Sequence, residues 1–271
     1  MTRIAVIGGG RIGEALIAGL LQSGRAPKDL VVAESFPARA AELTALFGIR
    51  ATTIADAAEG ADVVVIAVKP NDVDSVMAEL TSVELDGDRE QLVVTLAAGL
   101  PTSRYEAKLP AGFPVVRVMA NTPMLVGEGV SAIAGGRYAK AEHLALVTDI
   151  LASVGKVIAV AESQMDAVTA VSGSGPAYFF LIAEAMVDAG VGIGLTRATA
   201  TELVVQTMLG SAAMLDRSGE SAADLRAAVT SPGGTTAAAL RELERGGVRT
   251  AFYEALVAAK SRSAALGGGT E

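Results

Sequence analysis

Two hydrophobic patterns alternate along roughly the first 160 residues of the chain. Short runs rich in β-branched residues are typical of strands that are buried on both faces of a parallel sheet. These runs occupy residues 3–8, 30–34, 62–68, 91–96 and 114–119. Between them, apolar residues recur three and four positions apart, as in residues 14–22 and 38–47, which predicts crossover helices. Alternating strands and helices predict a doubly wound α/β domain.

Beyond about residue 160 the β-rich runs stop and a helical pattern replaces them. Ser163 and Asp166 form an S-x-x-D capping pattern at the first of these helices. The predicted helices occupy residues 164–171, 175–190, 196–217, 222–230, 235–244 and 248–266. The second is apolar almost all round, so we expect it to be buried in its own domain or against a partner chain in a homodimer. We therefore expect an N-terminal α/β domain over residues 1–162 and a C-terminal all-helical dimerisation domain over residues 163–271.

Three glycines follow the first predicted strand in a G-x-G-x-x-G pattern. Gly8 permits a tight turn, Gly10 lets a pyrophosphate approach the backbone, and Gly13 lets helix and strand pack closely. The helix that begins here directs its positive amino end at the phosphates. Because the pattern follows a strand and opens a helix, we interpret the first domain as a Rossmann dinucleotide-binding domain. The predicted cofactor contacts in this loop are Ile7, Gly8, Gly9, Gly10, Arg11, Ile12 and Gly13.

The end of the second predicted strand carries conflicting signals about the cofactor. Glu34 stands where an acidic residue takes the ribose 2′-hydroxyl of NAD. Ser35 and Arg39 follow, and they would hold the 2′-phosphate of NADP. A solvated turn is the alternative for Glu34 and Arg39, so the sequence leaves NAD and NADP both open.

Three later strand ends are expected at the same crevice, because ligands of open α/β sheets bind outside the carboxyl ends of the strands. The predicted contacts there are Ala67, Val68, Lys69, Pro70, Ala97, Ala98, Gly99 and Asn121. The alternative interpretations are a surface cation for Lys69, the first turn of a helix for Pro70, and plain strand-to-helix packing for residues 97–99. Asn121 lies in a loop before Thr122 and Pro123, and we expect it to face the nicotinamide or the substrate.

Composition and charge exclude several classes of protein. The 271 residues carry a formal charge of −8, and no basic run suggests a nucleic-acid surface. The chain contains no cysteine, which removes disulfides, thiolate nucleophiles and cysteine-based metal sites. The amino terminus is too glycine-rich for a signal peptide, and the apolar runs stop short of the ~20 residues of a membrane span. We therefore expect a soluble cytoplasmic protein.

The residue types and motifs that the sequence lacks narrow the possible catalytic chemistry further. The single histidine, His143, falls in a polar-faced helix and is expected on the surface. No Ser-His-Asp set and no metal-ligand spacing occur, so no metal site is predicted. What remains is catalysis by a bound cofactor, with the protein supplying orientation and electrostatics.

The hexapeptide SPGGTT, residues 231–236, interrupts a helical tail with residues that a helix interior disfavours. Gly233 and Gly234 leave room for a ligand against the main chain, and Ser231, Thr235 and Thr236 offer hydroxyl donors. The start of a helix also presents free backbone N–H groups to an anion. This stretch therefore has the features of a binding site for an anion, with a simple helix cap as the alternative.

Several motifs together resemble the pyrroline-5-carboxylate reductase family over nearly the whole chain. They are VIGGGRIGEALIAGLL, AVKP, AAG, RVMANTP, AVTAVSGSGPAYFFLIAEAMVDAG and AAVTSPGGTTAAALRELERGG. The resemblance implies NAD(P)H-dependent reduction of 1-pyrroline-5-carboxylate to L-proline, the last step of proline biosynthesis, with NADPH as the usual cofactor. It also implies a Rossmann domain followed by a helical dimerisation domain, and dimers that often form a ring of five.

The resemblance also implies roles for individual residues. Gly234, Thr235 and Thr236 would bind the substrate carboxylate and ring. Thr236 would act in catalysis by hydrogen-bonding the imine nitrogen or relaying its proton. Glu162 matches a position near substrate, with an ordinary acidic residue at a helix start as its alternative.

The chain departs from the family pattern at two places, and two other functions compete. Ala120 stands where the family commonly has proline, and Ile54 where many members have an asparagine near the adenosine ribose. A β-hydroxyacid dehydrogenase would need a lysine on the first long helix of the second domain, but residues 171–195 contain no lysine or arginine. A non-catalytic NADP-binding sensor would not need the SPGGTT stretch.

Overall fold

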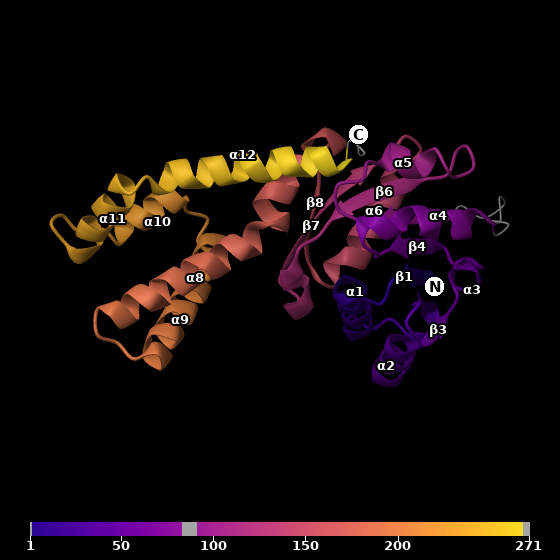
Figure 1. Ribbon diagram of the computed structural model, residues 1–271, viewed down its shortest axis with the longest axis horizontal. Helices are drawn as coiled ribbons and strands as arrows, with labels where there is room; N and C mark the ends of the chain where they lie inside the picture. The colour runs from indigo at the N-terminus through magenta and orange to yellow at the C-terminus, as the bar shows by residue number, and fades with distance from the viewer. Residues whose placement is uncertain (1, 83–90, 268–271) are drawn as a thin grey trace. The chain divides into compact units, whose positions relative to one another are not determined.

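The structure is a computed structural model that describes residues 2–82 and 91–267 (Figure 1). Its residues divide into two compact units, Met1–Ser174 together with Ala259–Glu271, and Gly175–Ala258. The first unit contains a mixed sheet flanked by helices, and the second is helical. Together they confirm the predicted fold class of an α/β Rossmann domain followed by an all-helical domain.

The sheet formed by the described residues has eight strands in the order β3-β2-β1-β4-β5-β6-β7-β8. The strands are β1 (Ile4–Ile7), β2 (Leu30–Ala33), β3 (Arg50–Thr52), β4 (Val63–Ile66), β5 (Leu92–Thr95), β6 (Val115–Met119), β7 (Gly129–Gly135) and β8 (Gly155–Ala159). All neighbouring pairs are parallel except β6 and β7. The strand order reverses between β1 and β4, which is the point where doubly wound sheets bind dinucleotides.

The five predicted strands are confirmed, whereas β3, β7 and β8 were not predicted. β3 has only three residues, none of them buried. β7 reads GVSAIAG and β8 reads GKVIA, so small and polar residues replace the β-branched run in each. These strands depend on pairing with their neighbours in the sheet more than on their own composition.

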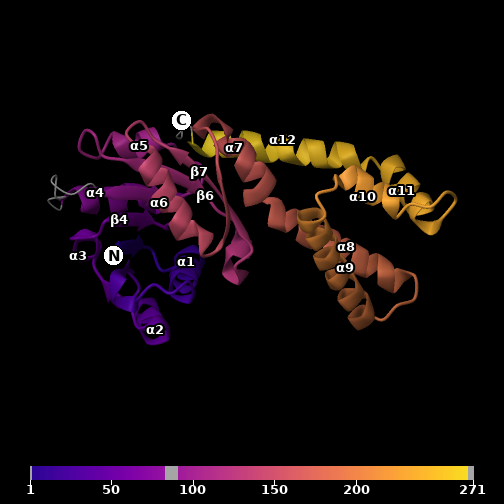
Figure 2. The same cartoon turned by 180° about the vertical axis from the view of Figure 1, so that it is seen from behind.

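Helices cover both faces of the sheet, as Figures 1 and 2 show from opposite sides. One apolar cluster joins one face to α1 (Arg11–Gln22), α2 (Pro37–Phe47) and α6 (Ala141–Ala152). A second cluster joins the other face to α3 (Ile54–Ala58), α4 (Val73–Ser82) and α5 (Thr102–Glu106). Along β1, Ile4 and Val6 belong to the first cluster and Ala5 and Ile7 to the second, because successive strand side chains point to opposite faces. Burial on both faces explains the continuous apolar runs in the central strands.

The first part of the predicted helical domain packs with the sheet. After β8 the chain forms η4 (Glu162–Gln164), α7 (Met165–Val168) and η5 (Thr169–Gly173), the last being a π-helical turn. Met165 is fully buried in a cluster with Ala132 and Ala134 of β7. The compact sheet-containing unit therefore extends to Ser174.

The second unit contains the remaining helices. They are α8 (Gly175–Gly192), α9 (Arg197–Arg217), α10 (Ala222–Ala228), α11 (Thr235–Arg245) and the first part of α12 (Val248–Gly267). These helices confirm the predicted segments to within a few residues. Val187 of α8 packs with Ala200 and Val204 of α9 in a small core. Many other large apolar side chains of α8 and α9 are exposed, among them Phe180 and Leu209.

One expectation about exposure is wrong. His143 is buried, and its Nδ1 accepts a hydrogen bond of 3.0 Å from the Lys140 backbone N–H at the start of α6. It lies inside because α6 packs on the sheet and its first turn needs an acceptor. In addition, the helical run Glu162–Gly192 is long and apolar enough, by length and composition, to cross a membrane. Core helices of soluble proteins have the same length and composition.

Candidate functional site

The glycine loop between β1 and α1 has the geometry expected for a dinucleotide cradle. Gly8 has a φ of +104°, which favours glycine. A Cβ at Gly13 would lie closer than 3.0 Å to the Gly8 carbonyl oxygen, so helix and loop approach as closely as predicted. A Cβ at Gly10 would meet no atom within 4 Å, and Gly10 is the N-cap of α1 with no side-chain cap. The loop therefore leaves open space before the free N–H groups of the helix, as a pyrophosphate requires.

Glu34 and Arg39 hold the peptide groups on either side of Gly9. The Glu34 carboxylate accepts hydrogen bonds from the Gly9 N–H at 2.8 Å and the Phe36 N–H at 2.9 Å. Arg39 donates from Nε to the Gly9 carbonyl oxygen at 2.9 Å. Arg39 also pairs with Glu42 and Glu14, and hydrogen bonds to these carboxylates raise the pKa of its guanidinium. Glu34 and Arg39 are therefore not simply part of a solvated turn, because their hydrogen bonds to Gly9 fix the conformation of the glycine loop.

The segment after β4 lies beside this loop at the reversal point of the sheet. The Ala67 N–H donates to the Ile7 carbonyl oxygen at 2.8 Å. A Cβ at Gly8 would be 2.9 Å from Val68 Cγ1 and 3.0 Å from the Ala67 carbonyl oxygen. Lys69 is exposed and precedes η2 (Pro70–Asp72), which Pro70 begins. The AVKP stretch and the glycine loop are thus adjacent, as predicted.

The AAG stretch after β5 meets the end of the chain's last helix. Gly99 has a φ of +81°, and a Cβ there would lie 3.2 Å from Leu266 Cβ. Ala97 is buried, and its N–H donates to Thr95 Oγ1 at 3.2 Å. Ser263, near the end of α12, donates from its hydroxyl to Asp166 Oδ1 at 2.7 Å. The last turns of α12 therefore pack against a predicted cofactor loop, a contact that the sequence did not indicate.

Asn121, expected to face the nicotinamide or the substrate, has both ends of its amide bound within the protein. Its Nδ2 donates to the Ser172 carbonyl oxygen at 3.1 Å, and its Oδ1 accepts from the Val130 N–H at 2.9 Å. The residue is only 9% exposed. These contacts connect the end of β6 with β7 and with the π-helical turn.

Glu162 likewise has protein partners. Its two carboxylate oxygens accept from the Thr102 N–H and hydroxyl, each at 2.7 Å. Arg117 of β6, buried to 5% exposure, lies 3.6 Å from the same carboxylate. Glu162 thereby caps α5 and balances a buried charge. Sequence reasoning missed Thr102 and Arg117, although the Pro101–Thr102 helix start is a signal that a capping partner is needed.

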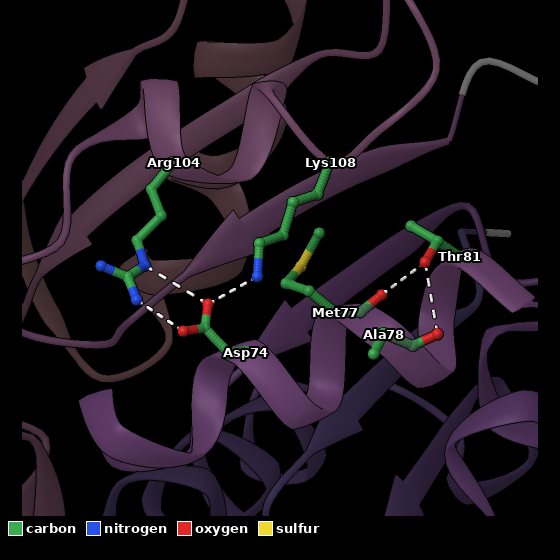
Figure 3. Close-up of polar contacts among 6 residues, drawn as sticks. All are labelled: Asp74, Met77, Ala78, Thr81, Arg104 and Lys108. Atoms are coloured by element: carbon green, nitrogen blue, oxygen red, sulfur yellow. Dashed lines mark hydrogen bonds and ion pairs between the residues drawn. The ribbon is translucent and has the colours of Figure 1, made fainter.

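Ion pairs join Asp74 of α4 to Arg104 of α5 and to Lys108, which follows α5 (Figure 3). Arg104 and Lys108 bind the Asp74 carboxylate, with distances of 2.5 Å from Arg104 Nη2 and 2.6 Å from Lys108 Nζ. Hydrogen bonds from Arg104 and then Lys108 lower the pKa of Asp74 to about 2. These pairs are half-exposed, so each contributes little alone.

The SPGGTT stretch forms a turn that opens α11. Gly233 has a φ of +68°, and the Gly234 N–H donates to the Ser231 carbonyl oxygen at 3.0 Å. Gly234 is the N-cap of α11 and supplies no side-chain cap. Ser231 and Thr235 are exposed and Thr236 is half-buried. The first turn of α11 therefore presents backbone N–H groups with hydroxyls beside them, and a positive dipole end.

Comparison with known proteins gives consistent matches over both units. A family model described as pyrroline-5-carboxylate reductase dimerisation matches residues 162–266, and one described as NADP oxidoreductase, coenzyme F420-dependent, matches residues 3–99. A curated pyrroline-5-carboxylate reductase of Mycobacterium tuberculosis is 55% identical over 98% of this chain and 97% of its own length. The chain belongs to the pyrroline-5-carboxylate reductase family. It is accordingly an NAD(P)H-dependent oxidoreductase with a dimerisation domain.

Solved structures of pyrroline-5-carboxylate reductases agree with this assignment. The Coxiella burnetii protein superposes with a TM-score of 0.93 at 37% identity, covering 98% of each chain. The Plasmodium falciparum protein, solved with NADP bound, gives 0.85 at 30% identity and covers 98% of each chain. The resemblance drawn from the sequence motifs is therefore confirmed for the family and the fold.

Proposed function

We propose that the chain reduces 1-pyrroline-5-carboxylate to L-proline with NAD(P)H, the last step of proline biosynthesis. The observation that carries the proposal is the pair of uncapped helix starts, α1 after the glycine loop and α11 after the SPGGTT turn. Each offers backbone donors to an anion, as the cofactor pyrophosphate and the substrate carboxylate require.

The glycine loop, the AVKP stretch and the AAG stretch form the proposed cofactor site. The free N–H groups at the start of α1 bind the pyrophosphate in the open space beside Gly10. Glu34, Ser35 and Arg39 lie at the proposed adenosine ribose end, where Glu34 and Arg39 also fix Gly9. The bound cofactor supplies a hydride to the C=N carbon of the imine.

The amino end of α11 forms the proposed substrate site. Backbone N–H groups of Thr235 and Thr236 bind the carboxylate, with Ser231, Gly233 and Gly234 shaping the turn. The Thr236 hydroxyl donates to the imine nitrogen, which makes the C=N carbon more electrophilic. For Glu162, the contacts with Thr102 and Arg117 favour a positioning role at α5 over direct contact with substrate.

The assembly we propose is a homodimer, and further a ring of five dimers, in the cytoplasm. The exposed apolar side chains of the second unit support it. Phe179 is 60% exposed and Phe180 69% exposed on α8, within the region that matches the dimerisation family. Side chains of this kind form the apolar centre of stable subunit interfaces.

Replacing Thr236 with valine tests the proposed chemistry. The variant removes only the hydroxyl, so kcat with 1-pyrroline-5-carboxylate should fall by about tenfold or more, as for loss of a positioned proton donor. The Kd for NADPH, measured by fluorescence titration, should change by less than about threefold, since Thr236 lies outside the proposed cofactor site.

Thr81→Val is the matched control. Its hydroxyl donates to the Met77 and Ala78 carbonyl oxygens of its own helix, as Figure 3 shows, far from either proposed site in sequence. That variant should keep the wild-type kcat. Wild-type kcat in Thr236→Val, or a loss of NADPH affinity instead, would remove Thr236 from the imine.

A further inference from the structure

The end of α12, residues 263–267, belongs to the sheet-containing unit, as do α7 and the AAG stretch. Ser263 is 4% exposed, and its hydroxyl donates to Asp166 Oδ1 of α7 at 2.7 Å. Figure 2 shows the two helices side by side at this point. Met165, the residue before Asp166, is fully buried against β7. Because α7 is fixed on the sheet in this way, the hydrogen bond attaches the end of α12 to a rigid part of the unit.

One helical turn beyond Ser263, the same face of α12 meets the AAG stretch. Residues three and four positions apart lie on one face of a helix, so Leu266 and Gly267 share the face of Ser263. A Cβ at Gly267 would lie closer than 3.0 Å to the Gly99 carbonyl oxygen, and a Cβ at Gly99 would lie 3.2 Å from Leu266 Cβ. Backbone therefore packs on backbone here, and a glycine on each side makes the approach possible.

The AAG stretch depends on such packing for its conformation. Gly99 has a φ of +81°, and glycine has more conformational freedom than any other residue, so the local sequence does little to fix this turn. Ala97 and Leu100 are buried in the second apolar cluster. Gly99 is buried as well, and the three atoms nearest to a Cβ built on it all belong to the end of α12. The stretch is thus fixed by the core on one side and by α12 on another, while Ala98 stays half-buried.

We propose that Ser263 is a positioning residue for cofactor binding, because its hydrogen bond to Asp166 keeps the end of α12 packed on Gly99. The part that concerns NADPH rests on the proposed function, in which the AAG stretch contacts the cofactor. A stretch that is ordered before binding loses little conformational entropy when the cofactor binds, so the hydrogen bond acts on the Kd for NADPH. Once bound, the cofactor orders the stretch itself, and kcat at saturating NADPH changes little.

Three variants test the hydrogen bond as the cause. Ser263→Ala should raise the Kd for NADPH about threefold to tenfold, the range that corresponds to one lost hydrogen bond. Its kcat at saturating NADPH should stay within about twofold of wild type. Asp166→Ala should raise the Kd by a similar factor. The double variant should stay within about twofold of the weaker-binding single variant, because both substitutions break the same bond.

Matched variants separate the bond from the substitutions themselves. Asp166→Asn keeps an oxygen that accepts from Ser263, so its Kd for NADPH should stay within about twofold of wild type. Ser261→Ala makes the same change at an exposed serine of the same helix and should keep the wild-type Kd. Gly267→Ala disturbs the contact from its other end, since the added Cβ must displace the Gly99 backbone. It should raise the Kd at least as much as Ser263→Ala.

Hydrogen–deuterium exchange of the cofactor-free protein tests the positioning without a ligand. Peptides that contain residues 97–100 should exchange faster in Ser263→Ala than in wild type, and at the wild-type rate in Ser261→Ala. This readout separates the inference from the proposed function. A wild-type protein that does not turn over 1-pyrroline-5-carboxylate refutes that function, while exchange and NADPH titration still decide whether Ser263 positions the AAG stretch.

Three results would overturn the inference. The first is a wild-type Kd for NADPH in Ser263→Ala. The second is a double variant in which the two single effects on the Kd multiply, which would mean that Ser263 and Asp166 act separately. The third is a lower melting temperature of Ser263→Ala with unchanged exchange at residues 97–100, which would leave Ser263 a purely structural role.

Discussion

An added methyl group should affect the stability of the protein differently at two glycines of the cofactor loop, Gly13 and Gly10. Gly13 lies in the first turn of α1, where alanine would ordinarily gain up to about 1 kcal/mol in helix propensity. A Cβ at Gly13, however, would lie closer than 3.0 Å to the Gly8 carbonyl oxygen, 3.2 Å from the Gly8 carbonyl carbon and 3.3 Å from Val6 Cγ1. Two of these three atoms are backbone and cannot rotate away, so the loop or the helix must move.

In Gly13→Ala, the steric clash should cost more free energy than the alanine gains in helix propensity. Overpacking of this kind costs about 1 to 3 kcal/mol, and the upper part of that range exceeds the propensity gain. Because about 1 kcal/mol shifts the melting temperature of a domain of this size by about 2 to 4 °C, we expect a net loss of several degrees. NADPH affinity should fall as well, since the displaced loop carries Gly8 and Gly10.

Gly10→Ala is the matched control. Gly10 has a φ of −68°, which alanine adopts freely, and its Cβ would meet no atom within 4 Å. Stability should therefore stay within about 0.5 kcal/mol of wild type. The methyl group would enter the space proposed for the pyrophosphate, so NADPH affinity should fall by about tenfold or more, equivalent to about 1.4 kcal/mol.

Thermal unfolding followed by circular dichroism, with NADPH titration of each variant, measures both quantities. The reasoning is refuted if Gly13→Ala melts at or above the wild-type temperature. It is equally refuted if Gly10→Ala binds NADPH as tightly as wild type.

Three further predictions concern charges near the sites. Glu34→Gln should raise the ratio of kcat/KM for NADPH to that for NADH by about tenfold, since a carboxylate repels a dianionic 2′-phosphate by about 1 to 2 kcal/mol at ~5 Å in water; an unchanged ratio places Glu34 away from the ribose. Glu162→Gln should lower the free energy of unfolding by about 1 to 2 kcal/mol, because buried Arg117 loses its counter-charge, and urea unfolding that matches wild type would contradict this. Asp74, with its pKa lowered to about 2, contributes stability that is present near neutral pH and is lost as the pH falls from about 4 to about 2; Asp74→Asn should flatten the acid side of a melting-temperature profile in this range.

The sequence predicted those features that depend on short stretches of chain. The glycine loop needed only three glycines at fixed spacing after a strand, and the helix pattern identified the second unit. Asn121 and Glu162 show where such reasoning ends. Their partners lie 51 and 60 residues away, at Ser172 and Thr102, and no local pattern encodes these pairs.

The NAD or NADP question remained open in the sequence for a related reason. Glu34 and Arg39 each have a ribose role in isolation, but the structure shows them bound to the N–H and the carbonyl oxygen of Gly9, with Arg39 also paired to Glu14 and Glu42. The unpredicted strands β7 and β8 are similar cases, because sheet pairing stabilises small and polar residues that do not indicate strands alone.

The most direct test of the central claim follows the hydride. Purified protein is incubated with L-1-pyrroline-5-carboxylate and NADPH carrying deuterium at both C4 positions of the nicotinamide, and the product is analysed by mass spectrometry. The account predicts L-proline that is one mass unit heavier, with the deuterium on C5, formed as NADPH is oxidised. Unlabelled proline, or no oxidation of NADPH or NADH in the presence of the imine, would contradict it.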